Sequence, residues 1–133
     1  MATILIVDDS NSIRALLEAA LVAAGHTVLT AADGQHGIRM FSGNEIDVLV
    51  TDVYMPNADG LDVLREWRRL KRGPNVIVMS SKTGPMNMLR SAKHLGAKMT
   101  LQKPFPAEQL VAAINSMLTG AKKPAPENPA DTQ

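Results

Sequence analysis

The feature that most constrains the fold is an alternation between two kinds of segment. Runs of consecutive apolar residues, rich in Val and Ile, occur at residues 4–7, 48–50 and 76–79. Such runs are typical of strands buried on both faces, as in a parallel sheet. Weaker runs at 27–30 and 99–101 fit strands nearer an edge of the same sheet. The sequence therefore predicts five short strands.

The segments between these runs have helical spacing. Three of them carry an apolar stripe: Ile13, Leu16, Leu17, Ala20, Leu21 and Ala24; Leu61, Leu64, Trp67 and Leu70; Leu110, Ile114, Met117 and Leu118. Shorter helices are predicted around residues 34–42 and 86–95, the first capped by Asp33. A glycine, which adopts the left-handed conformation easily, follows each helical segment. These glycines are Gly25, Gly43, Gly73, Gly96 and Gly120.

The result is a βα unit repeated five times, with strands beginning near residues 3, 27, 47, 75 and 98. This alternation predicts a doubly wound α/β fold, in which five helices cover both faces of a parallel sheet. Because crossovers are right-handed, the commonest small solution is the strand order 2-1-3-4-5. We expect one domain over residues 1–120. Residues 121–133 contain three prolines and no large apolar side chain, so we expect a disordered tail there.

Composition excludes several classes of function. Fourteen Lys and Arg against thirteen Asp and Glu leave a net charge of +1, which implies no general attraction to nucleic acid or anionic lipid. Five cations within residues 65–72 are interpreted as a solvated helix face. There is no cysteine, which rules out disulfides, Cys-ligated zinc and thiol catalysis. With no membrane-length apolar run and no secretory signal, we expect a cytoplasmic protein.

Polar residues collect where the predicted strands end. They follow the first, third, fourth and fifth strands: Asp8 and Asp9, Asp52, Ser80, and Lys103. Ligands of open parallel sheets bind beyond the carboxyl ends of the strands. In the order 2-1-3-4-5 these four strands are neighbours. We therefore expect the five side chains to converge on one rim of the sheet.

The chemistry of this set points to phosphoryl transfer. Three crowded carboxylates repel one another, and a hard divalent cation such as Mg²⁺ removes that repulsion. Lys103 supplies a positive charge for phosphate oxygens, and a serine hydroxyl can donate to another. Phosphoryl transfer depends largely on such positioning and charge neutralisation. A carboxylate can itself be the nucleophile and form an aspartyl phosphate.

These residues also carry a resemblance that covers about residues 3–118. The sequence is similar to the receiver domains of response regulators, of the stand-alone chemotaxis-regulator type, which have a flavodoxin-like fold. The resemblance rests on short motifs at the predicted strand ends and loops: Val7-Asp8-Asp9-Ser10, Asp52, Met55-Pro56, Gly60, Ser80, Gly96-Ala97 and Lys103-Pro104-Phe105. Each motif is weak alone, and their order makes the set specific.

The resemblance implies a metal site and a phosphoacceptor. Asp52 would accept the phosphoryl group. Asp8 and Asp9 would hold Mg²⁺, with Asp52 and the backbone carbonyl of Tyr54 as further ligands. The phosphodonor would be a phosphohistidine on a sensor histidine kinase or a histidine phosphotransfer protein.

The resemblance also implies how the signal is passed on. Ser80 would hydrogen-bond the phosphoryl group, Lys103 would bridge to one of its oxygens, and the Lys103–Pro104 bond would be cis. A downstream protein would bind the face built from the fourth helix, fifth strand and fifth helix. The chain would be a monomer or weak dimer, and a signalling switch whose only chemistry is its own phosphorylation and dephosphorylation.

The sequence departs from the family pattern at several positions. Thr100 stands where the family has its switch aromatic, so this chain must signal differently or with a smaller change. Ser81 stands where alanine or glycine is usual. Tyr54 and Lys82 lie two residues beyond Asp52 and Ser80, at positions that influence dephosphorylation. We hypothesise that the phenol of Tyr54 impedes the attacking water and lengthens the life of the phosphorylated state.

Other functions remain open at this point. A weakly phosphorylated receiver could act as a constitutive adaptor, which Thr100 and Ser81 favour. A Mg²⁺-dependent aspartyl-phosphate phosphohydrolase usually needs a second acid two residues after the nucleophile, where this chain has Tyr54. A flavodoxin-like cofactor binder would need a phosphate loop after the first strand, where Asp8 and Asp9 would repel the phosphate.

Overall fold

The sheet has five parallel strands in the order β2-β1-β3-β4-β5, as the sequence predicts. The computed structural model describes residues 2–53, 60–81, 90 and 92–119, apart from the side chain at 81. The strands begin within one residue of the predicted positions: β1 (Thr3–Val7), β2 (Thr27–Ala31), β3 (Val48–Asp52), β4 (Val76–Ser81) and β5 (Met99–Lys103). The predicted tail at 121–133 lies outside the described residues.

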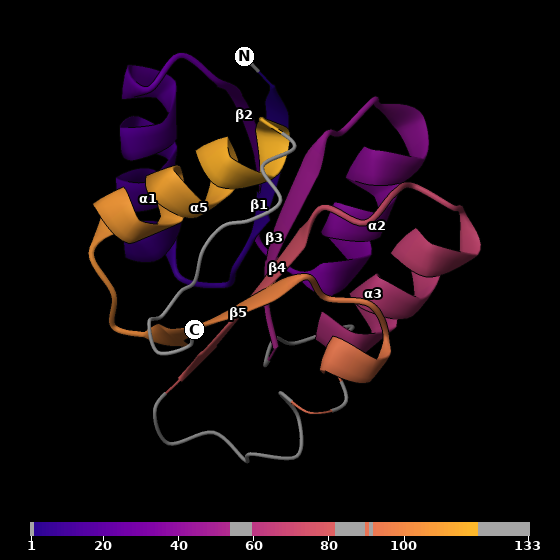
Figure 1. Ribbon diagram of the computed structural model, residues 1–133. Helices are drawn as coiled ribbons and strands as arrows, with labels where there is room; N and C mark the ends of the chain where they lie inside the picture. The colour runs from indigo at the N-terminus through magenta and orange to yellow at the C-terminus, as the bar shows by residue number, and fades with distance from the viewer. Residues whose placement is uncertain (1, 54–59, 82–89, 91, 120–133) are drawn as a thin grey trace.

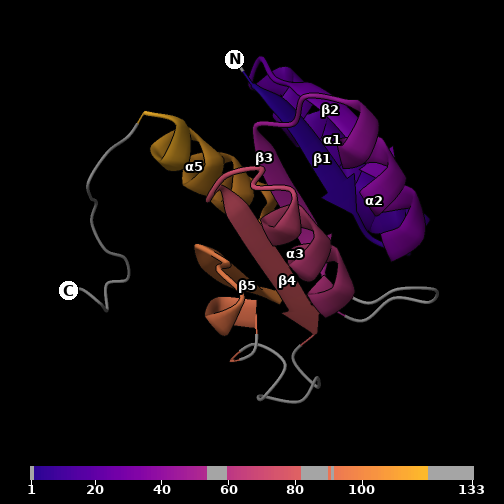
Figure 2. The same cartoon turned by 90° about the vertical axis from the view of Figure 1, so that its right-hand side faces the viewer.

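Helices cover both faces of the sheet. Four are described as complete elements: α1 (Asn11–Ala23), α2 (Gly34–Gly43), α3 (Gly60–Arg69) and α5 (Ala107–Leu118). Residues 90 and 92–94 are also helical, within the segment where the fourth helix is expected. Helices α1 and α5 lie together on one face, and α2 and α3 lie on the other (Figures 1 and 2). No described helix is long and apolar enough to span a bilayer.

The continuous apolar runs are explained by two separate cores. Side chains alternate between the faces of a strand, so both faces of a central strand need apolar residues. Ile4 and Ile6 of β1 pack in the core beneath α1 and α5, whereas Leu5 and Val7 pack in the core beneath α2 and α3. All four side chains are fully buried.

Most of the predicted helix ends are confirmed. Asp33 caps α2 by accepting a hydrogen bond from the backbone N–H of His36 at 2.8 Å. Gly25, Gly73 and Gly96 have the positive φ angles expected after a helix. The prediction for the second helix was wrong in detail, because Gly43 is the last residue of α2 and its φ is not positive. Gly120 lies outside the described residues.

The apolar stripe of α1 is narrower than the sequence predicts. Leu17 and Leu21 are buried, but Leu16 is 55% exposed. Residues 16 and 17 lie about 100° apart around a helix axis. Once Leu17 and Leu21 face the sheet, Leu16 turns toward solvent.

Candidate functional site

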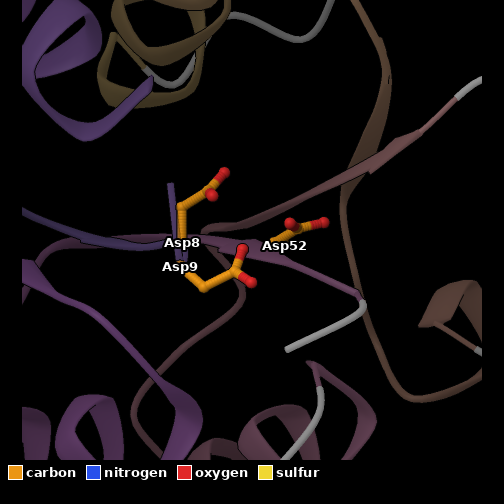
Figure 3. A group of neighbouring side chains, drawn as sticks. All are labelled: Asp8, Asp9 and Asp52. Atoms are coloured by element: carbon orange, nitrogen blue, oxygen red, sulfur yellow. The ribbon is translucent and has the colours of Figure 1, made fainter. Parts of the chain in front are cut away.

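The carboxyl ends of the strands bring three carboxylates together, as predicted. Asp8 and Asp9 follow β1, and Asp52 is the last residue of β3. One ligand oxygen from each lies within 4.8 Å of the others, and the three side chains lie near one another at the ends of β1 and β3 (Figure 3). Asp8 is fully buried and Asp52 nearly so, whereas Asp9 is exposed. The cluster is therefore open to solvent on the side of Asp9.

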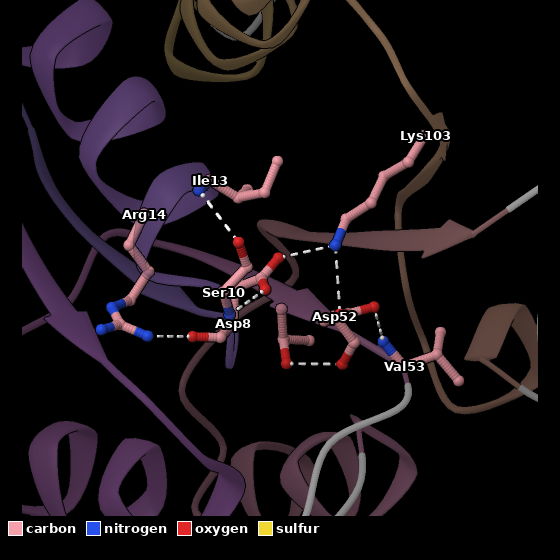
Figure 4. Close-up of polar contacts among 8 residues, drawn as sticks. Asp8, Ser10, Ile13, Arg14, Asp52, Val53 and Lys103 are labelled. Carbon is pink, nitrogen blue, oxygen red and sulfur yellow. Dashed lines mark hydrogen bonds and ion pairs between the residues drawn. The ribbon is translucent and has the colours of Figure 1, made fainter.

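The predicted lysine closes one side of this cluster. Lys103, at the end of β5, places its Nζ 2.7 Å from Oδ2 of Asp8 and 3.1 Å from Oδ2 of Asp52 (Figure 4). The lysine side chain is 20% exposed. One ammonium group thus bridges two carboxylates that come from neighbouring strands.

The electrostatics of the site leave its negative charge only partly compensated. Burial raises the pKa of Asp52, and the charge of Asp8 acts in the same direction. Lys103 and the backbone N–H of Val53 oppose this rise and do not cancel it. For Lys103, burial acts to lower the pKa, but the hydrogen bond to Asp8 and the charges of both carboxylates raise it overall. A further cation would stabilise the ionised cluster.

The backbone around Asp52 is held tightly. Its Oδ1 accepts from the N–H of Val53 at 2.8 Å, and its carbonyl accepts from Oγ1 of Thr51 at 3.0 Å.

The close packing of α3 against β3 explains why the first residue of α3 is a glycine. A Cβ on Gly60 would lie 2.3 Å from the carbonyl oxygen of Asp52, which is too close for any other residue. Helix α3 therefore starts directly against the end of β3.

Ser80 lies close to the end of β4, where the sequence places it, and is 6% exposed. Its Oγ has no hydrogen-bond partner among the described residues. Buried hydroxyls are nearly always paired, because an unpaired one loses its bonds to water without replacement. Ser80 follows Met79, the register partner of Asp52, so its buried hydroxyl lies at the rim of the sheet that carries the acidic cluster. A group bound at this rim would supply the missing partner.

The donor set fits Mg²⁺. The three clustered side chains offer only oxygen ligands, two of them buried and one exposed. Hard divalent cations prefer such ligands, and Mg²⁺ usually takes few carboxylates and keeps several waters. The cluster is exposed to water on the side of Asp9, as such a partly hydrated ion requires.

Some residues of the predicted site lie outside the described ranges, and the structure shows one contact to the site that the sequence did not predict. Tyr54 and Lys82 lie outside the described residues, as does the side chain of Ser81. The cis bond between Lys103 and Pro104 is confirmed. The sequence motifs did not include Arg14, whose guanidinium donates to the carbonyl oxygen of Asp8 at 2.6 Å. The sequence feature that could have indicated this contact is an arginine in the first turn of a helix that follows two acidic residues.

A family model described as the response regulator receiver domain matches residues 4–115. The DNA-binding transcriptional regulator NtrC of Azospirillum brasilense is 35% identical over 136 residues, covering 99% of this chain and 28% of NtrC. The response regulator SaeR of Staphylococcus aureus is 35% identical over 123 residues, covering 92% of this chain and 53% of SaeR. The chain thus spans about a quarter to a half of these curated relatives.

Solved structures show the same similarity. A response regulator receiver domain protein from Clostridium thermocellum superposes with a TM-score of 0.81 at 34% identity, covering 90% of this chain and 96% of that one. The chemotaxis response regulator CheY4 of Vibrio cholerae superposes with a TM-score of 0.77 at 32% identity, covering 86% and 97%.

Proposed function

Because this chain belongs to the response regulator receiver domain family, we propose that it accepts a phosphoryl group from a phosphohistidine onto Asp52. The reaction depends on Mg²⁺ and changes the binding of the chain to a partner protein. Receiver domains are signalling switches of two-component phosphorelays, so the chemistry serves regulation rather than metabolite turnover.

The observation that carries the proposal is the cluster itself. Asp8, Asp9 and Asp52 present oxygens within 4.8 Å of one another, and Lys103 contacts two of the three. Asp8 and Asp9 would hold Mg²⁺ together with Asp52 and the carbonyl of Tyr54. When bound, the ion neutralises charge on the phosphoryl oxygens.

The chemical step uses the Asp52 carboxylate as the nucleophile. One of its oxygens attacks phosphorus, an O–P bond forms, the P–N bond to the donor imidazole breaks, and the imidazole keeps that electron pair. Lys103 is placed to exchange its contact with Asp52 for one with a phosphoryl oxygen. The Oγ of Ser80, which has no hydrogen-bond partner among the described residues, donates to another oxygen. Later attack by water on phosphorus breaks the O–P bond to Asp52, which releases inorganic phosphate and returns the free carboxylate.

The expected partners follow from membership in the receiver domain family. The phosphodonor is a sensor histidine kinase or a histidine phosphotransfer protein, and the chain works in the cytoplasm as a monomer or weak dimer. Phosphorylation replaces the single negative charge of the Asp52 carboxylate with about two on the phosphoryl group next to Lys103, which favours a different packing of the rim. The output partner binds the face that includes β5 and α5, and Thr100 of β5, where the family has an aromatic, limits the size of that change.

Intact-mass measurement after incubation with a small acyl phosphate and Mg²⁺ tests this proposal. We expect one phosphoryl adduct, absent in Asp52→Asn and absent when EDTA is added. Asp62→Asn is the matched control, because Asp62 lies on α3 and pairs with Arg65 outside the cluster. No adduct on a folded wild-type chain would instead support a constitutive adaptor. Continuous phosphate release at enzymatic rates would support a phosphohydrolase.

A further inference from the structure

We propose that Arg14 is a positioning residue for the Mg²⁺ site. Its guanidinium holds the main chain of Asp8 against the first turn of α1, and this contact sets the direction of the Asp9 carboxylate. The inference rests on the proposed function, because it takes the three-carboxylate cluster to be the Mg²⁺ site.

The geometry of Arg14 links the loop to the helix. Nη1 donates to the carbonyl oxygen of Asp8 at 2.6 Å, and Nη2 donates to the side-chain Oδ1 of Asn11. Arg14 is only partly exposed, although it lies on a surface helix. In Figure 4 its guanidinium and the Lys103 ammonium reach Asp8 from opposite sides. One cation therefore contacts the main chain of Asp8, and the other contacts its carboxylate.

Three further hydrogen bonds secure the same loop. The N–H of Asp8 donates to the carbonyl of Ala31 at 3.1 Å, and the N–H of Ser10 donates to Oδ1 of Asp8 at 2.9 Å. Oγ of Ser10 caps α1 by accepting from the N–H of Ile13 at 3.2 Å. Together with the contacts of Arg14, these bonds fix the chain on both sides of residue 9.

Asp9 depends on this support more than its neighbours do. Its carboxylate is exposed and makes no hydrogen bond or ion pair with any other described residue. Its direction is therefore set by the backbone that carries it. A loosened loop would leave Asp8 held by Lys103 and Ser10, but would let Asp9 drift away from the cluster. Mg²⁺ requires near-ideal octahedral geometry, so its binding is sensitive to such a drift.

The planar fork of arginine suits this task, and lysine does not. A guanidinium presents several N–H groups in fixed directions and can bond the loop and the helix together, whereas an ammonium group is a single point charge. The charge of Arg14 has the opposite effect on Mg²⁺, because a nearby cation repels it. Removal of the charge alone would tighten Mg²⁺ binding, and removal of the fork would weaken it.

Mg²⁺ titration of the purified wild-type protein and two Arg14 variants by calorimetry separates these two effects. Arg14→Lys keeps the charge and loses the fork, and Arg14→Gln loses both. We expect Arg14→Lys to raise the Kd for Mg²⁺ by about tenfold, as is common when residues that orient metal ligands are changed. Arg14→Gln should raise the Kd less, because the lost positive charge partly offsets the lost fork. We also expect the preference for Mg²⁺ over Ca²⁺ to fall in both, because Ca²⁺ tolerates looser geometry. Arg39→Gln, an exposed arginine on α2, is the control and should leave both quantities unchanged.

Each other outcome has a defined meaning. Wild-type affinity in Arg14→Lys with tighter binding in Arg14→Gln would show that only the charge matters, and would overturn the proposal. If an Arg14 variant has a lower Tm without Mg²⁺ but an unchanged Kd for Mg²⁺, the arginine has a purely structural role. That result would also overturn the proposal. If Arg14→Gln does not fold, Arg14→Lys alone decides. Asp9→Asn should lose most of the affinity whatever Arg14 does, and failure of wild-type protein to bind Mg²⁺ would instead overturn the proposed function.

Discussion

The ammonium nitrogen of Lys103 lies 2.7 Å from Oδ2 of Asp8, although the two residues are 95 positions apart in the sequence. They meet because β5 and β1 run parallel and end at the same rim of the sheet. The same nitrogen contacts Asp52 at 3.1 Å. Without Mg²⁺, this one side chain offsets the repulsion between two buried carboxylates.

Removal of the Lys103 charge should therefore destabilise the Mg²⁺-free protein. We expect Lys103→Met, which keeps most of the side-chain length and removes the charge, to lower the free energy of unfolding by about 2 kcal/mol, because two buried carboxylates lose their shared cation. Mg²⁺ should recover part of this loss by neutralising the same carboxylates. Urea denaturation with and without Mg²⁺ measures both effects. Equal unfolding free energies for the two proteins without Mg²⁺ would contradict this account of the bridge.

Asp52→Asn should stabilise the Mg²⁺-free protein at pH 7 while it abolishes phosphorylation. The pKa of Asp52 is raised above 3.8 in the folded state, chiefly by burial, so the folded chain holds this proton more tightly than the unfolded chain does. Ionisation of Asp52 therefore costs stability as the pH rises from 3.8 through the folded-state pKa. Asparagine avoids that cost.

The pH profile tests the sign of this effect. The stability advantage of Asp52→Asn should be largest above the folded-state pKa of Asp52 and should shrink as the pH falls toward 3.8. Chemical denaturation of both proteins at matched pH values, with EDTA present, gives the difference directly. If the stability advantage of Asp52→Asn instead grew on acidification, the effect of Lys103 and Val53 on the pKa of Asp52 would outweigh the effect of burial.

Gly60→Ala should damage the site through the backbone. The added Cβ would lie 2.3 Å from the Asp52 carbonyl oxygen and 2.8 Å from Cα of Val53, neither of which can rotate away. We expect a loss of about 2 kcal/mol in unfolding free energy and slower phosphorylation, because α3 must shift from β3. Gly43→Ala is the control, since nothing lies within 4 Å of its Cβ position and its φ is ordinary. It should leave stability equal or slightly higher.

Ser80→Ala should separate stability from function. The Ser80 hydroxyl is buried without a partner in the described part of the chain, so its loss should leave the free energy of unfolding unchanged or raise it by up to about 1 kcal/mol. The rate of phosphorylation by an acyl phosphate should fall, because the phosphoryl group loses a hydrogen-bond donor. Denaturation curves and adduct formation over time measure the two quantities. A marked destabilisation would show that the hydroxyl is already paired in the free protein.

Local sequence patterns accounted for the elements and their order. The apolar run at residues 4–7 requires a strand buried on both faces, and the two cores beneath β1 confirm it. The cap at Asp33 and the positive φ at Gly25 depend only on neighbouring residues. Once the strands are parallel, Asp8, Asp52 and Lys103 must share an edge. The carboxylate cluster was therefore predictable without coordinates.

The tertiary structure alone decided the contacts that depend on how a helix is rotated and where a loop runs. Periodicity placed Leu16 in the apolar stripe, but the rotation of α1 against the sheet left it 55% exposed. The same rotation brings Arg14 to the Asp8 carbonyl, and the start of α3 leaves no room for a side chain at Gly60. The sequence by itself determines strand order and the rim on which the polar residues gather, because these follow from local spacing. Distances and charge balance at that rim arise only when separate elements pack together.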